Sequence, residues 1–219
     1  MRIIDLSHTI TSETVSYKGF PAPVICDYLS REQSAHLYEE GTSFQIARMD
    51  MVTNTGTYLD SPFHRYVHGK DLSEISLQRL VRIPALIVRN PWKIKLETDI
   101  EDLHHLQVRN KAVLIHTGWD KKWMTEDYYS NHPYLTEDAA NWLFEQGAIL
   151  VGIDSHNIDD TRGKGRPVHS VLLHQDIYIV EHLSNLDNIP EHAIVLFTAV
   201  PPKIKGVGTF PVRAFAEIA

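Results

Sequence analysis

Two residues that could share a metal ion, Asp60 and His64, lie four positions apart in the segment Asn54–His64. Gly56 permits a tight backbone conformation in this segment, and Pro62 stiffens it. A carboxylate and an imidazole on a rigid turn can bind one ion together, or the imidazole can act as a general base beside a carboxylate-bound ion. A surface turn with a solvated histidine explains the pair equally well. This spacing alone therefore leaves both interpretations open.

A second group of candidate ligands consists of His169 and Glu181. Glu181 ends the apolar run Ile177–Val180, which is predicted to be a strand, and the strand ends of open α/β sheets are where ligands gather. His169 lies in a helix-like segment before this run and could reach the same place. The alternative is a glutamate that simply faces water at the end of its strand.

The elements that must position these residues form a mixed α/β pattern. Thr136 is predicted to cap a helix over Glu137–Gln146, and Thr98 to open a second one over Asp99–Leu106. Gly147 supplies the stop of the first helix. Short apolar runs, mostly β-branched, predict strands at Arg2–Leu6, Ile83–Val88, Ala112–Ile115, Ile149–Ile153, Ile177–Val180 and Ala193–Thr198. Strands interleaved with helices indicate the α/β class.

Two long polar loops, Trp119–Pro133 and Asp154–Pro167, interrupt this pattern, and long structured loops are often functional. The chain contains no internal repeat, low-complexity tract or linker rich in glycine, serine or proline. We therefore expect a single domain over residues 1–219.

Composition excludes several classes of protein. Of the 219 residues, 43% are hydrophobic and 22% charged, as in soluble globular domains, and no apolar run approaches the roughly 18 residues of a membrane span. A net charge of -7 argues against binding to nucleic acid or to an anionic membrane. The single cysteine, Cys26, cannot form an internal disulfide, so we expect a cytoplasmic protein. The 13 histidines favour imidazole chemistry.

Taken together, the motifs resemble the cyclase family of metal-dependent hydrolases, which includes bacterial kynurenine formamidase and isatin hydrolase. The family signature is His-x-Gly-Thr-His-x-Asp-x-Pro-x-His, and this chain matches it at Gly56, Thr57, Asp60, Pro62 and His64. The first and second signature histidines are replaced by Asn54 and Tyr58. Further similarity covers Ile4–His8, Leu114–Trp119, Gly152–Ser155, His169–Leu173 with Glu181, and Pro201–Ala216, which is expected to be a closing hairpin.

The resemblance implies a mixed α/β domain of the swivelling β/β/α type that forms a homodimer or homotetramer and binds a small-molecule substrate. It implies Asp60, His169 and Glu181 as metal ligands and His64 as the residue that accepts and donates a proton. The implied cofactor is a divalent metal, zinc in preference to manganese. Tyr17 lies where formamidases place an aromatic substrate contact, although simple packing is the alternative role for this ring.

The two replaced histidines predict a changed metal site. An amide oxygen such as that of Asn54 binds zinc weakly, and the phenol of Tyr58 would have to ionise, which ordinarily requires a pH near 10. We therefore expect one ion per chain rather than two, with Tyr58 free to act as an oxyanion donor. Three protein ligands with room for water are typical of an open catalytic site. His156 could supply a further ligand, but we favour a solvated loop histidine.

The predicted function is that of a metal-dependent, arylformamidase-like hydrolase of a small amide, lactam or lactone. The ion would lower the pKa of water, and His64 would take the proton and return it to the leaving group. One alternative is a metal-dependent lyase or cyclase, in which no water attacks. The other is a degenerate member of the family that binds a small molecule without turning it over.

Overall fold

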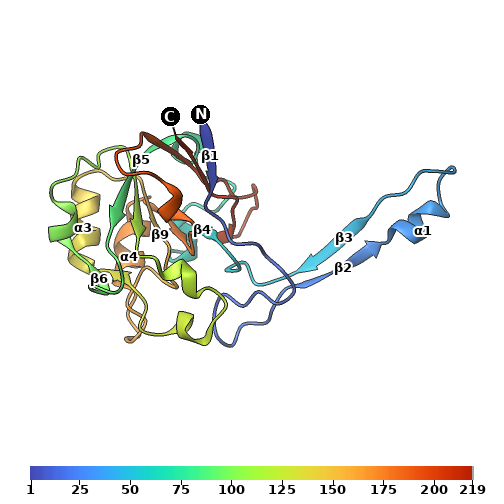
Figure 1. The fold of residues 1–219 in the computed structure, drawn as a ribbon, viewed down its shortest axis with the longest axis horizontal. Helices are drawn as coiled ribbons and strands as arrows, with labels where there is room; N and C mark the ends of the chain where they lie inside the picture. The colour runs from blue at the N-terminus through green and yellow to red at the C-terminus, as the bar shows by residue number, and fades with distance from the viewer. Residues whose placement is uncertain (219) are drawn as a thin grey trace.

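The computed structural model describes residues 1–218, most of which surround one curled β-sheet (Figure 1). The strands of this sheet are β1 (Arg2–Asp5), β4 (Tyr58–Asp60), β5 (Ile83–Arg89), β7 (Ala112–His116), β9 (Leu150–Ile153), β10 (Tyr178–Glu181), β11 (Val195–Thr198), β12 (Thr209–Pro211) and β13 (Phe215–Ile218). Their spatial order is β1-β13-β11-β5-β7-β9-β10-β4-β12. The predicted strands are confirmed, with ends that differ by one or two residues.

The centre of the sheet is parallel and buried on both faces. Strands β5, β7, β9 and β10 run in the same direction. Along β7, Ala112 and Leu114 face one hydrophobic core, and Val113 and Ile115 face the other. Burial on both faces explains why these strands are continuous apolar runs in the sequence.

Helices cover the face of the sheet that carries Val113 and Ile115. They include α2 (Ile100–Leu103), α3 (Glu137–Glu145) and α4 (Pro167–His174), and two-stranded pairing joins β6 (Glu97–Thr98) to β8 (Tyr134–Leu135). As predicted, the Thr136 hydroxyl caps α3, accepting the Ala139 amide at 3.2 Å. The prediction for α2 is wrong at its start, because the Asp99 carboxylate rather than Thr98 caps this helix, and the helix ends before Leu106. Within residues 1–218, no helix has the length and apolar character needed to cross a membrane.

The two edges of the sheet are brought together near the C-terminus. The predicted closing hairpin is wrong, since β12 pairs with β4 whereas β13 pairs with β1 and β11. Between these strands, the Val212 amide donates to the Thr57 carbonyl, and the Leu6 amide donates to the Ala214 carbonyl, both at 2.9 Å. The chain therefore crosses from one edge to the other. This crossing curls the sheet and places β12 against β4, next to Asp60.

A long arm, residues 21–51, projects from the body of the molecule (Figure 1). It consists of the antiparallel strands β2 (Val24–Leu29) and β3 (Ile46–Asp50), with helix α1 (Arg31–Ala35) near its tip. Large apolar side chains are exposed along it: Val24, Ile25, Tyr28, Ile46 and Met49. A two-stranded hairpin is marginally stable alone in water, so these apolar side chains mark an unusual surface.

Candidate metal centre and active site

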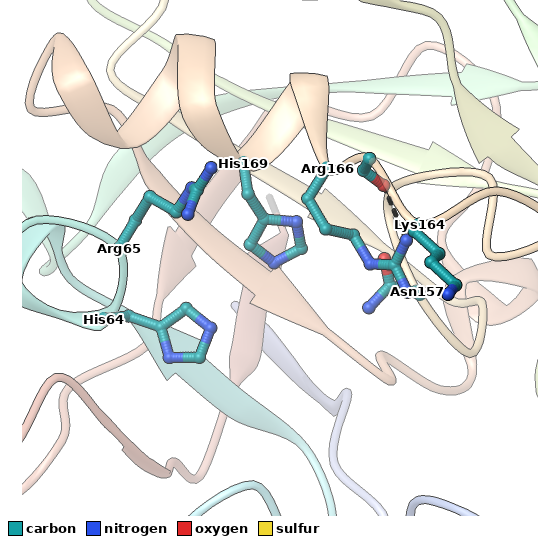
Figure 2. A pocket seen from close by; sticks show the side chains of 7 residues that line it. His64, Arg65, Asn157, Lys164, Arg166 and His169 are labelled. Atoms are coloured by element: carbon teal, nitrogen blue, oxygen red, sulfur yellow. Dashed lines mark hydrogen bonds between the residues drawn. The ribbon is translucent and has the colours of Figure 1, made fainter.

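Three elements bring Asp60, His64 and His169 together. Asp60 ends β4, His64 ends the 3₁₀ turn Pro62–His64 that follows, and His169 lies in the first turn of α4. One potential ligand atom from each of the three lies within 4.8 Å of the others, and the two imidazole centroids are 5.8 Å apart. Both imidazoles line one pocket (Figure 2). The two sequence segments singled out for chemistry thus meet in space.

The buried pair Asp60 and His169 has the donor set of a cation site. Asp60 Oδ2 is buried without a hydrogen-bond partner among the described residues and lies 3.7 Å from His169 Nε2. His169 Nδ1 lies 2.5 Å from the carboxylate of Asp159, which also accepts the Val168 amide. Because His169 Nδ1–H donates to Asp159, Nε2 is left to face Asp60, an orientation that is usual for metal-binding histidines. An unpartnered carboxylate oxygen beside this nitrogen fits a divalent ion.

The charges around His169 also favour a cation. Burial by itself would lower the pKa of His169, but the carboxylates of Glu181, Asp159 and Asp60 raise it to about 10. Burial likewise opposes ionisation of Asp60, yet His64, His169 and the Thr209 hydroxyl hold the pKa of Asp60 below its ordinary value. The centre therefore stabilises positive charge next to an ionised Asp60.

Thr209 orients His64. Its hydroxyl donates to Asp60 Oδ1 and lies 2.8 Å from His64 Nδ1. Since the only hydroxyl hydrogen of Thr209 is donated to Asp60, the Thr209 oxygen must accept a hydrogen bond from His64 Nδ1–H. His64 Nε2 is then left as a proton acceptor on a side chain that is 34% exposed. Gly208 makes this approach possible, because a Cβ there would come within 2.3 Å of the His64 amide nitrogen.

Glu181 borders the group and already has protein donors on both oxygens. Its Oε1 accepts the Ile158 amide at 2.6 Å and lies 3.6 Å from His169 Nε2. Its Oε2 accepts the Tyr58 hydroxyl at 2.5 Å. Burial raises the pKa of Glu181 to about 7, against the opposing effect of His169. The tightest group therefore contains His64 rather than Glu181, although Glu181 is as close to His169 Nε2 as Asp60 is.

The phenols of Tyr17 and Tyr58 lie behind Glu181. Their hydroxyl oxygens are 2.9 Å apart, and Tyr17 also accepts the Asn157 side-chain amide at 2.7 Å. Burial, reinforced by the charge of Glu181, raises the pKa of both phenols well above the ordinary value. Both are therefore neutral hydrogen-bonding groups near neutral pH. The substrate contact of Tyr17 and the oxyanion-donor role of Tyr58 stay predictions.

His156 is not a solvated loop residue, so that part of the sequence interpretation is wrong. Its side chain is buried, with the residue 5% exposed, and burial lowers its pKa to about 3. Its ring packs at 4.5 Å from the ring of Tyr17 and is not one of the three grouped ligands. The predicted loop folds inward at this point, since residues 154–159 are all buried.

Several site residues are not identified by the sequence interpretation. Asp159 offers one signal, an acidic residue ten positions before His169 in a loop already expected to be functional. Thr209 offers none, because its contact with Asp60 depends on the β4–β12 register. Arg65 and Arg166, which line the pocket, are ordinary surface residues by sequence alone.

The chain matches known proteins over most of its length. Residues 4–160 match the family model described as "Putative cyclase". The kynurenine formamidase of Geobacillus thermodenitrificans (strain NG80-2) is 31% identical over 179 residues, 80% of this chain and 81% of that protein. The kynurenine formamidase of Erythrobacter litoralis (strain HTCC2594) is 29% identical over 166 residues, 76% and 74% of the two chains.

Solved structures share the fold. Isatin hydrolase A from Labrenzia aggregata, bound to benzyl benzoate, superposes with a TM-score of 0.82 at 21% identity over 98% of this chain and 93% of that one. A protein described as a predicted metal-dependent hydrolase from Bacillus stearothermophilus has a TM-score of 0.77 at 26% identity, with coverage of 98% and 97%. These matches confirm the predicted α/β fold. They also confirm the prediction that the protein is a hydrolase that resembles the arylformamidases. The chain therefore belongs to the cyclase family of metal-dependent hydrolases.

Proposed function

We propose that this protein hydrolyses a small amide, lactam or lactone with the help of a divalent metal ion, as an arylformamidase does. The observation that carries the proposal is the buried, unpartnered Asp60 Oδ2 facing His169 Nε2. Two relatives of similar length are named kynurenine formamidase, which supports an amide substrate.

Asp60, His169 and Glu181 would hold the ion. His169 Nε2 lies 3.7 Å from Asp60 Oδ2 and 3.6 Å from Glu181 Oε1, so the three side chains can converge on a single site. We favour zinc, with manganese as the second choice, because a donor set of imidazole and carboxylate is usual for open zinc sites. When bound, such an ion polarises a carbonyl and lowers the pKa of water.

His64 would move the proton. Its Nε2 is free to accept a proton from the water that attacks the amide carbonyl, because Thr209 holds Nδ1. As the carbon–nitrogen bond breaks, His64 returns that proton to the leaving nitrogen. A formamide would give an amine and formic acid, whose proton passes to solvent to leave formate, and His64 would end in its starting state.

The test combines elemental analysis with a substrate panel. Protein purified without chelators is expected to carry a divalent ion and to hydrolyse at least one member of a panel of formanilides, lactams and lactones. His64→Asn should lower kcat by on the order of 10²–10⁴-fold with the metal retained. His169→Asn should lose both the metal and the activity.

Each other outcome has a definite meaning. Metal loss in His64→Asn would make His64 a ligand, as its place in the tightest group allows, and would refute its role as proton carrier. Full activity in that variant would place the chemistry elsewhere. A metal-loaded protein that converts substrates only without uptake of water would be a lyase or cyclase. A protein without metal or turnover would be the binding-only member of the family.

A further inference from the structure

The pocket beside the metal centre is small and lined by cations. It has a volume of about 220 Å³, below the roughly 300–1,000 Å³ usual for drug-sized ligands, so it suits a molecule with one ring. Its lining contains His64 and His169 together with Arg65, Lys164 and Arg166, and no acidic side chain. In Figure 2, Arg65 and Arg166 lie on opposite sides of His169.

These three cations have no carboxylate partner among residues 1–218. Arg65 Nε donates to the Ser170 hydroxyl at 3.2 Å, and Arg166 Nη1 donates to the carbonyls of Gly163 and Gly165. Such contacts orient each guanidinium without neutralising it. A chain with a net charge of -7 thus places three unpaired positive charges at one opening.

Arg162, on the same loop, shows the contrast. Its guanidinium lies 2.8 Å from the carboxylate of Asp160 and does not line the pocket. The loop therefore holds one neutralised arginine outside the pocket and an unneutralised one, Arg166, at the pocket. This difference gives a matched control for charge at nearly the same place in the sequence.

The backbone of α4 does not supply an anion site here. The amide groups of Val168 and His169 at the helix start donate to the buried carboxylate of Asp159. An anion that enters the pocket must therefore be recognised by side chains. Guanidinium groups suit this task, because their planar N–H pairs match a carboxylate and stay charged at any physiological pH.

We infer that the substrate is an anion, a one-ring formamide or related amide that carries a carboxylate, and that Arg65 and Arg166 bind this carboxylate while the amide faces His64 and His169. This inference rests on the proposed function for the amide part alone. The carboxylate part rests on the unpaired cations of the pocket. Lys164, exposed at the same opening, would add attraction without fixing an orientation.

A matched pair of substrates tests the inference through turnover. The wild-type protein is expected to hydrolyse 2-formamidobenzoate with a higher kcat/KM than formanilide, which lacks the carboxylate. Arg166→Gln and Arg65→Gln should each lower this ratio about tenfold, since each removes a charge-assisted hydrogen bond to the carboxylate. Arg162→Gln should leave the ratio unchanged. Equal kcat/KM for the two substrates, or a ratio insensitive to both arginines, would overturn the inference.

A binding measurement separates this inference from the proposed function. Calorimetry on metal-loaded protein is expected to give tighter binding of 2-aminobenzoate than of aniline, with the Kd for 2-aminobenzoate raised about tenfold by Arg166→Gln and not by Arg162→Gln. Arginine-dependent binding without turnover of any substrate would uphold the anion site and refute the hydrolase proposal. Turnover of formanilide, with 2-aminobenzoate bound no more tightly than aniline, would uphold the hydrolase proposal and refute the anion site.

Discussion

Tyr58 and Glu181 lie directly opposite each other across strands β4 and β10, and the phenol hydroxyl donates to the carboxylate at 2.5 Å. Burial raises the pKa of this phenol well above its ordinary value. At the position where the family signature has a histidine, this chain therefore holds a neutral donor that engages Glu181.

We predict one divalent ion per chain, because a neutral phenol and the Asn54 amide replace two imidazoles. The double variant Asn54→His, Tyr58→His is expected to bind a second ion. Elemental analysis of both proteins, purified without chelators, measures this. Two tightly held ions in the wild-type chain would show that Asn54 and Tyr58, or another side chain, do act as ligands.

Thr209→Val is expected to lower kcat about tenfold or more with the metal retained. The valine cannot accept a hydrogen bond from His64 Nδ1–H, so the ring loses the contact that directs Nε2 to the pocket. Thr209→Ser should restore the rate, because it restores the hydroxyl. The pH profile of kcat/KM should shift in the valine variant and not in the serine variant. If the valine variant keeps the rate and the pH profile of the wild type, Thr209 does not position His64.

Asp159→Asn is expected to weaken metal binding by about 10–100-fold, the range typical for carboxylates that orient a ligating histidine. The asparagine cannot carry the charge that pairs with His169 Nδ1. Competition with a chromogenic chelator measures the affinity. Asp160→Asn, at a partly exposed neighbour paired with Arg162, is the control. Unchanged affinity in Asp159→Asn would separate Asp159 from the metal centre.

The unfolding free energy is expected to fall as the pH drops below about 6.5, in part through His156. Burial lowers the pKa of this residue to about 3 in the folded state, whereas an unfolded histidine takes up a proton near pH 6.5. Proton uptake by the unfolded chain then removes about 2 kcal/mol of stability between pH 7 and pH 5. The rings packed around it belong to Tyr17, Tyr128, Tyr129, His132 and His182.

Urea unfolding at pH 7 and pH 5 measures this difference. In His156→Phe the difference between the two pH values should shrink by about 2 kcal/mol, since phenylalanine cannot take up a proton. If the two proteins lose the same stability, His156 does not contribute to the acid sensitivity.

The exposed arm predicts a homodimer or homotetramer. Ile25 lies opposite Met49 across the pair β2–β3, and these side chains are 40% and 51% exposed. Ile25→Lys combined with Met49→Lys should therefore lower the molar mass in solution, as measured by sedimentation or light scattering. Ile94→Lys, at a residue that is 80% exposed on the body, should leave the mass unchanged. A monomeric wild-type chain would contradict the prediction.

The sequence was informative where burial is continuous. Strands such as β7 are apolar on both faces, so composition alone locates them. Charged residues interrupt the apolar residues of the arm strands, Asp27 in β2 and Arg48 in β3, and β4 and β12 are only three residues long. Neither kind of strand gives a long hydrophobic run, so both escape prediction.

The candidate site divides in the same way. Asp60 and His169 lie in short motifs of fixed spacing, which a sequence displays directly. Thr209 joins the site through strand pairing, and Arg65 and Arg166 join it only because α4 and the 3₁₀ turn pack together. Such contacts depend on the tertiary arrangement, which local patterns do not encode.

The crossing of the chain between the two sheet edges has a consequence for biosynthesis. Asp60 receives its hydroxyl donor from Thr209, 149 positions later. On the ribosome, the first half of the nascent chain can carry the signature segment but cannot complete the centre, because His169, Glu181 and Thr209 have not yet been made. Contacts between residues so far apart form slowly. Uptake of the proposed ion would therefore come late, after synthesis of nearly the whole chain, and metal occupancy would report that folding is complete.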